Sequence, residues 1–582
     1  MVYIRFIYTV LLMLAVSGTI FAQGVTYTWD GTDGNWSDAT KWSPNGVPGP
    51  SDFINIGGGT VTLDGFYTTV GGSFTGGRLE GTQPFNVNGS LVWSGGAFAI
   101  DGNINITTNG TLSLTGDSDR FIDNCTLLNE GTITLSGNNA DIMLMNEATL
   151  ENDSLGVIEF LGNGSISFDD STNGGVIINN GEIKKLSGGG TSIIEAEFIA
   201  DGKLNIQTGE ILILRSSINP INGDILINPG ATLKLNDDTF RFNNVIVEGG
   251  GEFKVYNATV FATGFDGLII ETGTELSMVN VDGKLSGDGP IVIGGTFDWQ
   301  RGTIEGTGLM NVIGDMELID GGTRILNGRT LRLTGTALWL GTKALRLTGG
   351  ATLDIAPGGF FAIENNEEIF FTEPGGGQIL NRGTFAKPAG SSTSTLEVAL
   401  NNQGLVEVYS GRLLLENGGA TTNGTWATYT GAKTELSEGT FSFNGGTISE
   451  EGDFQLSGDE ITTTGSSLTI DATGNFLLGN GSIVNNTTIT NEGTFTLFKG
   501  TLSGVGSLIS NGKFNFDGSS TKSIVQQRVF INGGGFMNGT GTPRMDNQAR
   551  ITNGPNSTFE IQTDTPLELL NNSGIERNEN GG

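Results

Sequence analysis

The stretch Asn381–Trp426 reads NRGTFAKPAGSSTSTLEVALNNQGLVEVYSGRLLLENGGATTNGTW, and it carries the repeat that decides the fold. The phrase Asn-x-Gly, followed by a small and then an apolar residue, begins at Asn381 and returns at Asn402. An Asn-Gly pair follows at the same interval, at Asn423. Asn and Gly tolerate the positive φ angles of tight turns, so the phrase predicts a corner that recurs about every 20 residues.

The same phrase recurs along the whole chain, at Asn129, Asn179, Asn491 and, as NGKFNF, at Asn511. Between these corners, runs such as GTITLSG, GVIEFLG and LTIDATG alternate apolar with polar residues, which is typical of half-buried strands. Short strands with such a period predict an all-β parallel β-helix, in which stacked coils share one apolar core. We expect residues 66–582 to form the repeats, and the roughly 560 residues of the mature chain to give about 25 coils in a rod about 120 Å long.

A second phrase joins an aromatic residue to a glycine-rich turn. It begins at Phe74, Trp93, Trp299, Phe443 and Phe498. Because Trp93, Trp299 and Phe443 hold one place in the phrase, we predict that they pack in the core. A row of ligand-binding aromatic residues, which would favour carbohydrate, is the alternative.

The composition excludes several classes of function. The formal net charge of −33 at pH 7 would repel the phosphates of a nucleic acid, and it predicts a solvated acidic surface. The absence of histidine excludes Ser-His-Asp and Cys-His catalysis and His-based metal sites. Cys125 is the single cysteine, so the chain forms no internal disulfide and no thiolate zinc site.

Both ends of the chain carry signals of their own. Residues 1–22 combine Arg5, an apolar run and a small residue at Ala22, which predicts a cleaved secretory signal peptide. A retained membrane anchor is the alternative, and no later segment is apolar enough to span a bilayer. The run LLNNSGI from Leu569 resembles the start of another coil, so we expect the repeats to be incomplete at the C-terminus.

Carboxylate pairs are the one catalytic chemistry left open, since glycosidases use two such groups. The pairs are Asp117 with Asp119, Asp169 with Asp170, Asp237 with Asp238, Glu367 with Glu368, and Asp459 with Glu460. Each lies beside a predicted turn, where solvated acidic residues are common. We therefore predict no catalytic, cofactor or metal site, with calcium at the GDSDR sequence, which contains Asp117 and Asp119, as the alternative.

The N-terminal segment YTWDGTDGNWSDATKWSPNGVPGPSDFINI, residues 27–56, holds three of the seven tryptophans. It resembles the start of large bacterial exported β-solenoid surface proteins, of the autotransporter-passenger and haemagglutinin-like kind. The matching residues are Trp29, Gly31, Trp36, Ser37, Trp42, Ser43, Gly46, Pro48 and Asp52. The resemblance implies a right-handed parallel β-helix and secretion or display on the cell surface.

Together these observations predict a non-enzymatic, adhesin-like rod, monomeric, with carbohydrate or a host or matrix surface as partner. The alternative is a β-helix polysaccharide lyase or glycoside hydrolase with clustered Asp and Glu. The non-enzymatic interpretation predicts that acidic and basic side chains from three neighbouring coils do not converge in one groove.

The first coil of a stacked rod has no neighbour on its N-terminal side, so its core needs cover. We predict that residues 23–65 form an aromatic cap, built on Trp29, Trp36, Trp42, Pro48 and Asp52, that blocks edge-to-edge pairing. A carbohydrate site built on the same tryptophans is the alternative.

Overall fold

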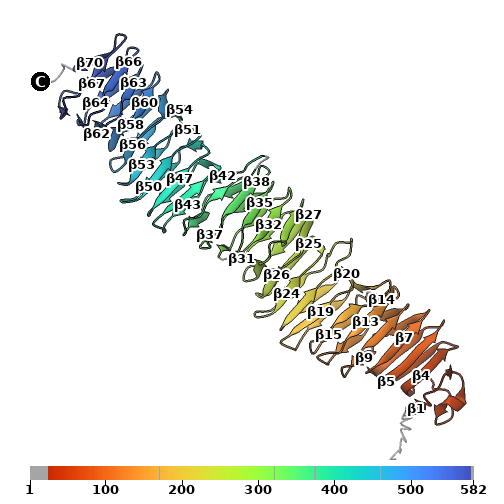
Figure 1. Cartoon of the computed structure of the whole chain (residues 1–582). Coiled ribbons are helices and arrows are strands. Elements are labelled where there is room, and N and C mark those ends of the chain that lie inside the picture. The colour runs from red at the N-terminus through yellow and green to blue at the C-terminus, as the bar shows by residue number, and fades with distance from the viewer. Residues whose placement is uncertain (1–23, 170, 320, 373–374, 459, 578–582) are drawn as a thin grey trace, which may run out of the picture.

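The protein is a parallel β-helix of about 25 turns that forms one long rod (Figure 1). The computed structural model describes residues 24–577 except residues 170, 320, 373–374 and 459, so the predicted signal peptide lies outside the described residues. Within the described residues the only helix is the short 3₁₀ segment η1 (Ala39–Lys41). The all-β prediction and the number of coils are confirmed.

Nearly every turn contributes a strand segment to each of three faces; in the turn that contains β22 (Glu210–Ile213), the isolated bridge of Ile221 with Phe242 takes the place of one strand. A representative pair of turns contains β10 (Arg120–Asp123), β11 (Thr126–Asn129) and β12 (Thr132–Leu135), followed by β13 (Ile142–Met145), β14 (Ala148–Asn152) and β15 (Val157–Phe160). Strand β10 pairs in parallel with β13, β11 with β14 and β12 with β15. We call the three stacks face A, face B and face C in that order, and name each corner by the faces it joins.

Alternating side chains explain why these short segments become strands. In β12 the sequence TITL buries Ile133 and Leu135 and leaves Thr132 and Thr134 half-buried on the outside. On face B, phenylalanines stack from coil to coil at centroid distances of 5.8, 5.1 and 5.7 Å through Phe454, Phe476, Phe495 and Phe514. The inward apolar side chains thus form one core along the rod.

Buried asparagine ladders form at the corners, as the Asn-x-Gly phrase predicts. At the B/C corner, Asn129 Nδ2 donates to Asn152 Oδ1 at 2.7 Å, and Asn152 Nδ2 donates to Asn179 Oδ1 at 2.7 Å. At the C/A corner, Asn381 Nδ2 donates to Asn402 Oδ1 at 2.9 Å. The phrase therefore marks a corner of the coil without specifying which of the three corners it is.

The register at two predicted corners differs from the sequence spacing. Asn402 is level with Thr421 of β48 (Gly419–Thr422) and not with Asn423, which is exposed with φ of 55°. Similarly, Asn491 of β58 (Thr488–Asn491) is level with Ser510 and not with Asn511. The turn length varies because corners accept loops of different length while the strands must stay paired.

Trp93, Trp299 and Phe443 are at most 1% exposed, so their predicted packing role is confirmed. Their expected equivalence is wrong, because they lie on different faces. Trp93 in β6 (Phe85–Trp93) and Phe443 in β51 (Thr440–Asn444) belong to face C, whereas Trp299 in β31 (Thr296–Trp299) belongs to face A. Three similar faces let one sequence phrase serve any of them.

Candidate functional site

The N-terminal tryptophans form one buried aromatic cluster at the start of the rod. The ring centroids of Trp29 and Trp36 each lie 4.9 Å from that of Trp42, and Trp36 stacks on Tyr67 at 4.9 Å. Trp29, Trp36 and Trp42 are 4%, 0% and 1% exposed. Their rings therefore offer no face to a ligand in solution, which argues against the carbohydrate alternative at this segment.

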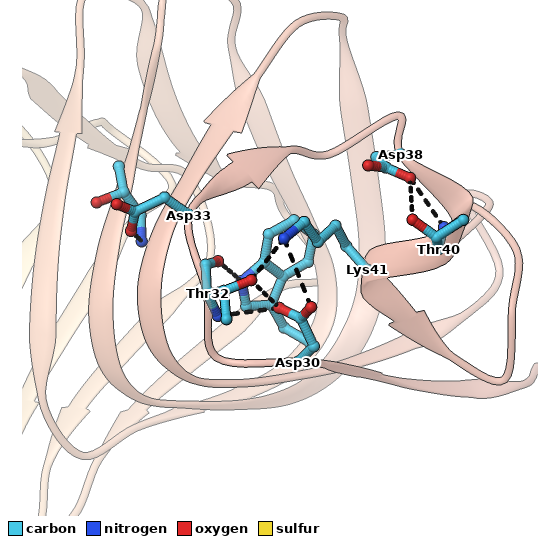
Figure 2. Close-up of polar contacts among 8 residues, drawn as sticks. Asp30, Thr32, Asp33, Asp38, Thr40 and Lys41 are labelled. Carbon is cyan, nitrogen blue, oxygen red and sulfur yellow. Dashed lines mark hydrogen bonds and ion pairs between the residues drawn. The ribbon is translucent and has the colours of Figure 1, made fainter.

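Polar contacts in the turns beside the cluster join Asp30, Thr32 and Lys41 (Figure 2). The indole Nε1 of Trp29 donates to the carbonyl of Thr32 at 2.7 Å. The Asp30 carboxylate accepts from the Thr32 backbone N–H at 2.9 Å and hydroxyl at 2.7 Å, and it lies 3.6 Å from Lys41 Nζ. The Thr32 hydrogen bonds, followed by the charge of Lys41, hold the pKa of Asp30 below its usual value.

Pro48 and Asp52, the other predicted cap residues, lie where the segment joins the first coil. Pro48 is buried, and Asp52 accepts from the backbone N–H groups of Val25 and Gly49, both at 2.8 Å. Strand β1 (Thr26–Trp29) pairs in parallel with β4 (Phe53–Leu63), as does β2 (Gly34–Asn35) further along β4. The segment thus adds a partial rung to two faces and fills the interior with indole rings.

Most of the acidic pairs singled out from the sequence lie at the surface of the rod. Their described members are exposed or half-buried: Asp117, Asp119, Asp169, Glu367, Glu368 and Glu460. Asp170 and Asp459 lie outside the described residues. Among the described residues, no group of three or more acidic, histidine or cysteine side chains has a geometry that could hold a metal ion. Asp237 and Asp238, by contrast, line a concave site.

That site consists of two hollows at the A/B corner that share Arg215. Their volumes are about 370 and 360 Å³. The first is lined by Phe168, Thr172, Asn173, Gly174, Gly175, Glu197 and Arg215, and the second by Glu195, Leu214, Arg215, Asp237 and Asp238. The guanidinium carbon of Arg215 lies 4.2 Å from the centroid of the Phe168 ring. We call the two hollows together the Arg215 groove.

Successive coils build the Arg215 groove. Phe168 ends β16 (Ile166–Phe168), Glu197 begins β20 (Glu197–Ala200), and Arg215 follows β22 (Glu210–Ile213). Asp237 and Asp238 precede β25 (Thr239–Glu248). Acidic and basic side chains from three neighbouring coils therefore converge here, so the expectation that they do not is wrong. The convergence by itself does not separate a binding groove from a catalytic one, because both need polar groups that form hydrogen bonds to a ligand.

Two of the four carboxylates in the groove are engaged in corner structure. Asp237 Oδ1 accepts from Asn257 Nδ2 at 2.8 Å. Asp238 accepts from the backbone N–H of Ser216 at 2.8 Å and from its neighbour Thr239 at 2.6 Å. These bonds tie consecutive coils together, so the two aspartates hold the walls of the groove.

A second acidic arrangement lies on the outer side of face A. Glu252 in β26 (Glu252–Val255) is level with Glu275 in β28 (Glu275–Met278), and Asp298 is level with Glu317 in β34 (Asp315–Leu318). A hollow of about 380 Å³ is lined by residues that include Glu252 and Glu275. We call Glu252, Glu275, Asp298 and Glu317 the face A carboxylates.

Crowding changes the acidity of two face A carboxylates. Burial, followed by the negative charges of Glu252 and Asp298, raises the pKa of Glu275. Burial also raises the pKa of Asp298, although a hydrogen bond from Gln300 opposes it. Sequence reasoning missed this group because each member belongs to a different coil, and only the strand register brings them together.

Comparisons with known proteins find no match for this β-helix. No protein-family model matches the chain, and neither does any curated protein. Across the described part of the chain, no helix has the length and apolar character to cross a membrane. The fold and the two surface sites therefore carry the functional argument.

Proposed function

We propose that the protein is an exported, non-enzymatic extracellular rod, adhesin-like, that binds carbohydrate in the Arg215 groove. The observation that carries this proposal is the meeting of an aromatic ring, a guanidinium group and carboxylates from successive coils in one concave site. Carbohydrate sites commonly use such carboxylates and guanidinium groups, because both bind hydroxyls, and here the Phe168 ring lies under the Arg215 guanidinium group and positions it.

Charge narrows the class of carbohydrate. Glu195, Glu197, Asp237 and Asp238 outnumber Arg215 in the groove, and the whole chain carries a formal charge of −33. Acidic polysaccharides would be repelled, so the ligand is a neutral or amino-sugar glycan. The same charge opposes self-association and supports a monomeric rod.

Export is supported by the pattern of residues 1–22 and by the resemblance of residues 27–56 to exported β-solenoid proteins. A rod with many exposed corners suits display at a cell surface or in an extracellular matrix, where weak contacts add up. The protein acts there by presenting binding surfaces at a distance.

A binding assay on immobilised neutral and amino-sugar glycans tests the proposal. Arg215→Ala and Glu197→Gln should each weaken binding by about tenfold or more, because each removes a charge-assisted hydrogen bond. Arg241→Ala is the matched control, since Arg241 lies 4.9 Å over the Phe261 ring but lines neither hollow. Equal binding by all four proteins, or no glycan bound by the wild type, would refute the proposal.

A polysaccharide-cleaving enzyme is the second candidate, favoured by the face A carboxylates. Glycosidases place two carboxyl groups beside the scissile bond, and the one that acts as acid has a raised pKa. Burial raises the pKa values of Glu275 and Asp298, and Glu252 is level with Glu275. Release of new reducing ends from a polysaccharide, abolished in Glu275→Gln and in Asp298→Asn, would establish this function. Unchanged release in both variants would point to a contaminating enzyme.

A further inference from the structure

One position of the A/B corner forms a continuous row along the middle of the rod. It is the residue that directly follows the face A strand in each coil. The row comprises Tyr256, Val279, Gln300, Ile319, Leu340, Glu364, Pro388, Tyr409 and Tyr429. We call it the corner row.

Backbone hydrogen bonds fix the register of the corner row. The N–H of Val279 donates to the carbonyl of Val255, the residue before Tyr256, at 3.4 Å. The N–H of Tyr429 likewise donates to Val408, the residue before Tyr409, at 2.9 Å. Consecutive members thus lie one coil apart, and eight steps of about 4.8 Å give a row about 40 Å long.

The corner row is unusually apolar for the surface of so acidic a chain. Tyr256, Ile319, Leu340 and Tyr409 are 38%, 38%, 50% and 43% exposed. Tyr409 and Tyr429 stack with centroids 4.1 Å apart, and the Tyr409 hydroxyl donates to Glu407 at 3.0 Å. The stack is therefore rigid, which lowers the entropic cost of binding a ligand against it.

The corner row continues the Arg215 groove. In the three coils before Tyr256, the same position is held by Glu195, Leu214 and Asn236. Glu195 and Leu214 line the second hollow of the groove. One corner of the rod therefore presents a polar groove and then an apolar ridge in a single line.

We propose that this line binds one long, linear, neutral polysaccharide, whose end or middle occupies the Arg215 groove while further sugars lie along the corner row. The inference rests on the proposed function and extends it from a short ligand to a polymer. Sugar rings present apolar C–H faces at regular intervals, which suits a ridge one residue wide with apolar groups in successive coils. Gln300, Glu364 and the tyrosine hydroxyls supply hydrogen bonds between them.

Other occupants fit the corner row less well. The strands beside it are paired on both sides, so an extended peptide finds no free strand edge there. A second copy of this chain would bring another charge of −33 alongside, and an anionic polymer would meet the same repulsion. A neutral polymer meets neither obstacle.

Calorimetric titration with neutral β-linked oligosaccharides of glucose and of N-acetylglucosamine, from the disaccharide to the longest soluble chain, tests the inference. Wild-type affinity should rise with chain length by about a hundredfold and then level off, as expected for added subsites. The triple variant Tyr256→Ala, Leu340→Ser, Tyr409→Ala should bind short chains like the wild type and lose that gain. Arg215→Ala should weaken binding at every length.

Matched controls lie at other corners. Phe265 and Leu155 are 91% and 69% exposed at the B/C corner, so Phe265→Ala and Leu155→Ser remove comparable apolar surface outside the corner row. Both should keep the length dependence. Circular dichroism and melting temperature establish that each variant is folded.

The outcomes separate the inference from the proposed function. Binding of short chains without any gain from length refutes the inference alone. Failure of every chain to bind refutes both. Self-association of the wild type in high salt, lost in the triple variant, would show that the corner row is a contact between copies of the rod and would overturn the inference.

Discussion

Replacing Trp36 by alanine should unfold the N-terminal end of the rod and leave the remaining coils intact. Trp36 is fully buried, and its ring contacts those of Trp42, Tyr67 and Phe85 at centroid distances of 4.9, 4.9 and 5.6 Å. Truncation of a buried aromatic residue to alanine costs about 3 to 5 kcal/mol. Among the described residues, the terminal rung packs against a coil on one side only, so the loss falls on a unit with little reserve.

Hydrogen exchange read out by mass spectrometry measures the effect locally. A loss of about 4 kcal/mol corresponds to roughly a thousandfold loss of protection where opening is local. We expect that loss in peptides from residues 25–63, and unchanged protection in coils beyond residue 110. Exposure of the β4 edge should also increase light scattering, since an unpaired strand edge promotes association.

Trp426→Ala is the matched control. Trp426 is 1% exposed in the interior of the stack, with coils on both sides, so its effect should spread in both directions. If Trp36→Ala leaves β4 protected, or lowers protection equally along the rod, the capping interpretation is wrong. Replacing Trp29, Trp36 and Trp42 together should cause aggregation; a folded rod that merely loses ligand binding would contradict the capping interpretation.

Three further predictions concern polar groups. Asn152→Leu should destabilise the rod by about 2 to 4 kcal/mol in denaturant unfolding, because it leaves the buried side-chain amides of Asn129 and Asn179 without their hydrogen bonds to Asn152. The same change at exposed Asn511 should cost under about 0.5 kcal/mol. Glu275→Gln should raise stability at pH 7. The pKa of Glu275 is higher in the folded than in the unfolded state, so wild-type stability falls as the pH rises above the unfolded-state pKa of about 4. The variant has no carboxyl group here, so denaturant unfolding should show no such fall. Burial lowers the pKa of Lys387 to about 8, so the unfolded state alone holds this proton between pH 8 and about 10; wild-type stability should gain relative to Lys387→Met over that range, and an equal pH dependence of the two proteins would refute this.

The fold could be predicted from the sequence because its signals are local. Alternation within short strands and Asn-Gly corners are properties of neighbouring residues, and they sufficed for the architecture and the number of coils. The register between neighbouring coils could not be predicted in this way. Asn423 lies past Thr421, the true partner of Asn402, because only interior packing determines how much loop each corner contains.

The candidate sites depended on that register and were largely beyond prediction. Glu275 and Asp298 have no pattern in the sequence that joins them, and Arg215 reaches Phe168 from a later coil. The tryptophan cluster could be predicted because its three tryptophans are close in sequence. Asp237 and Asp238 were noticed as a pair, yet their role in holding the groove walls follows from Asn257 and Ser216 of neighbouring coils.

The hydrogen bonds between coils run along the axis of the rod, and this direction determines how the molecule would respond to mechanical tension. A force along the axis acts on the hydrogen bonds between one pair of coils at a time, so each rupture releases a single turn. Turns differ in length: the one from Asn491 to its partner Ser510 is short, and the one from Asn152 to Asn179 is long. A turn about 4.8 Å thick would lengthen to about 65 to 95 Å when extended. A stiff spacer at rest thus becomes, under force, a tether that yields in small steps and dissipates the energy of a sudden pull.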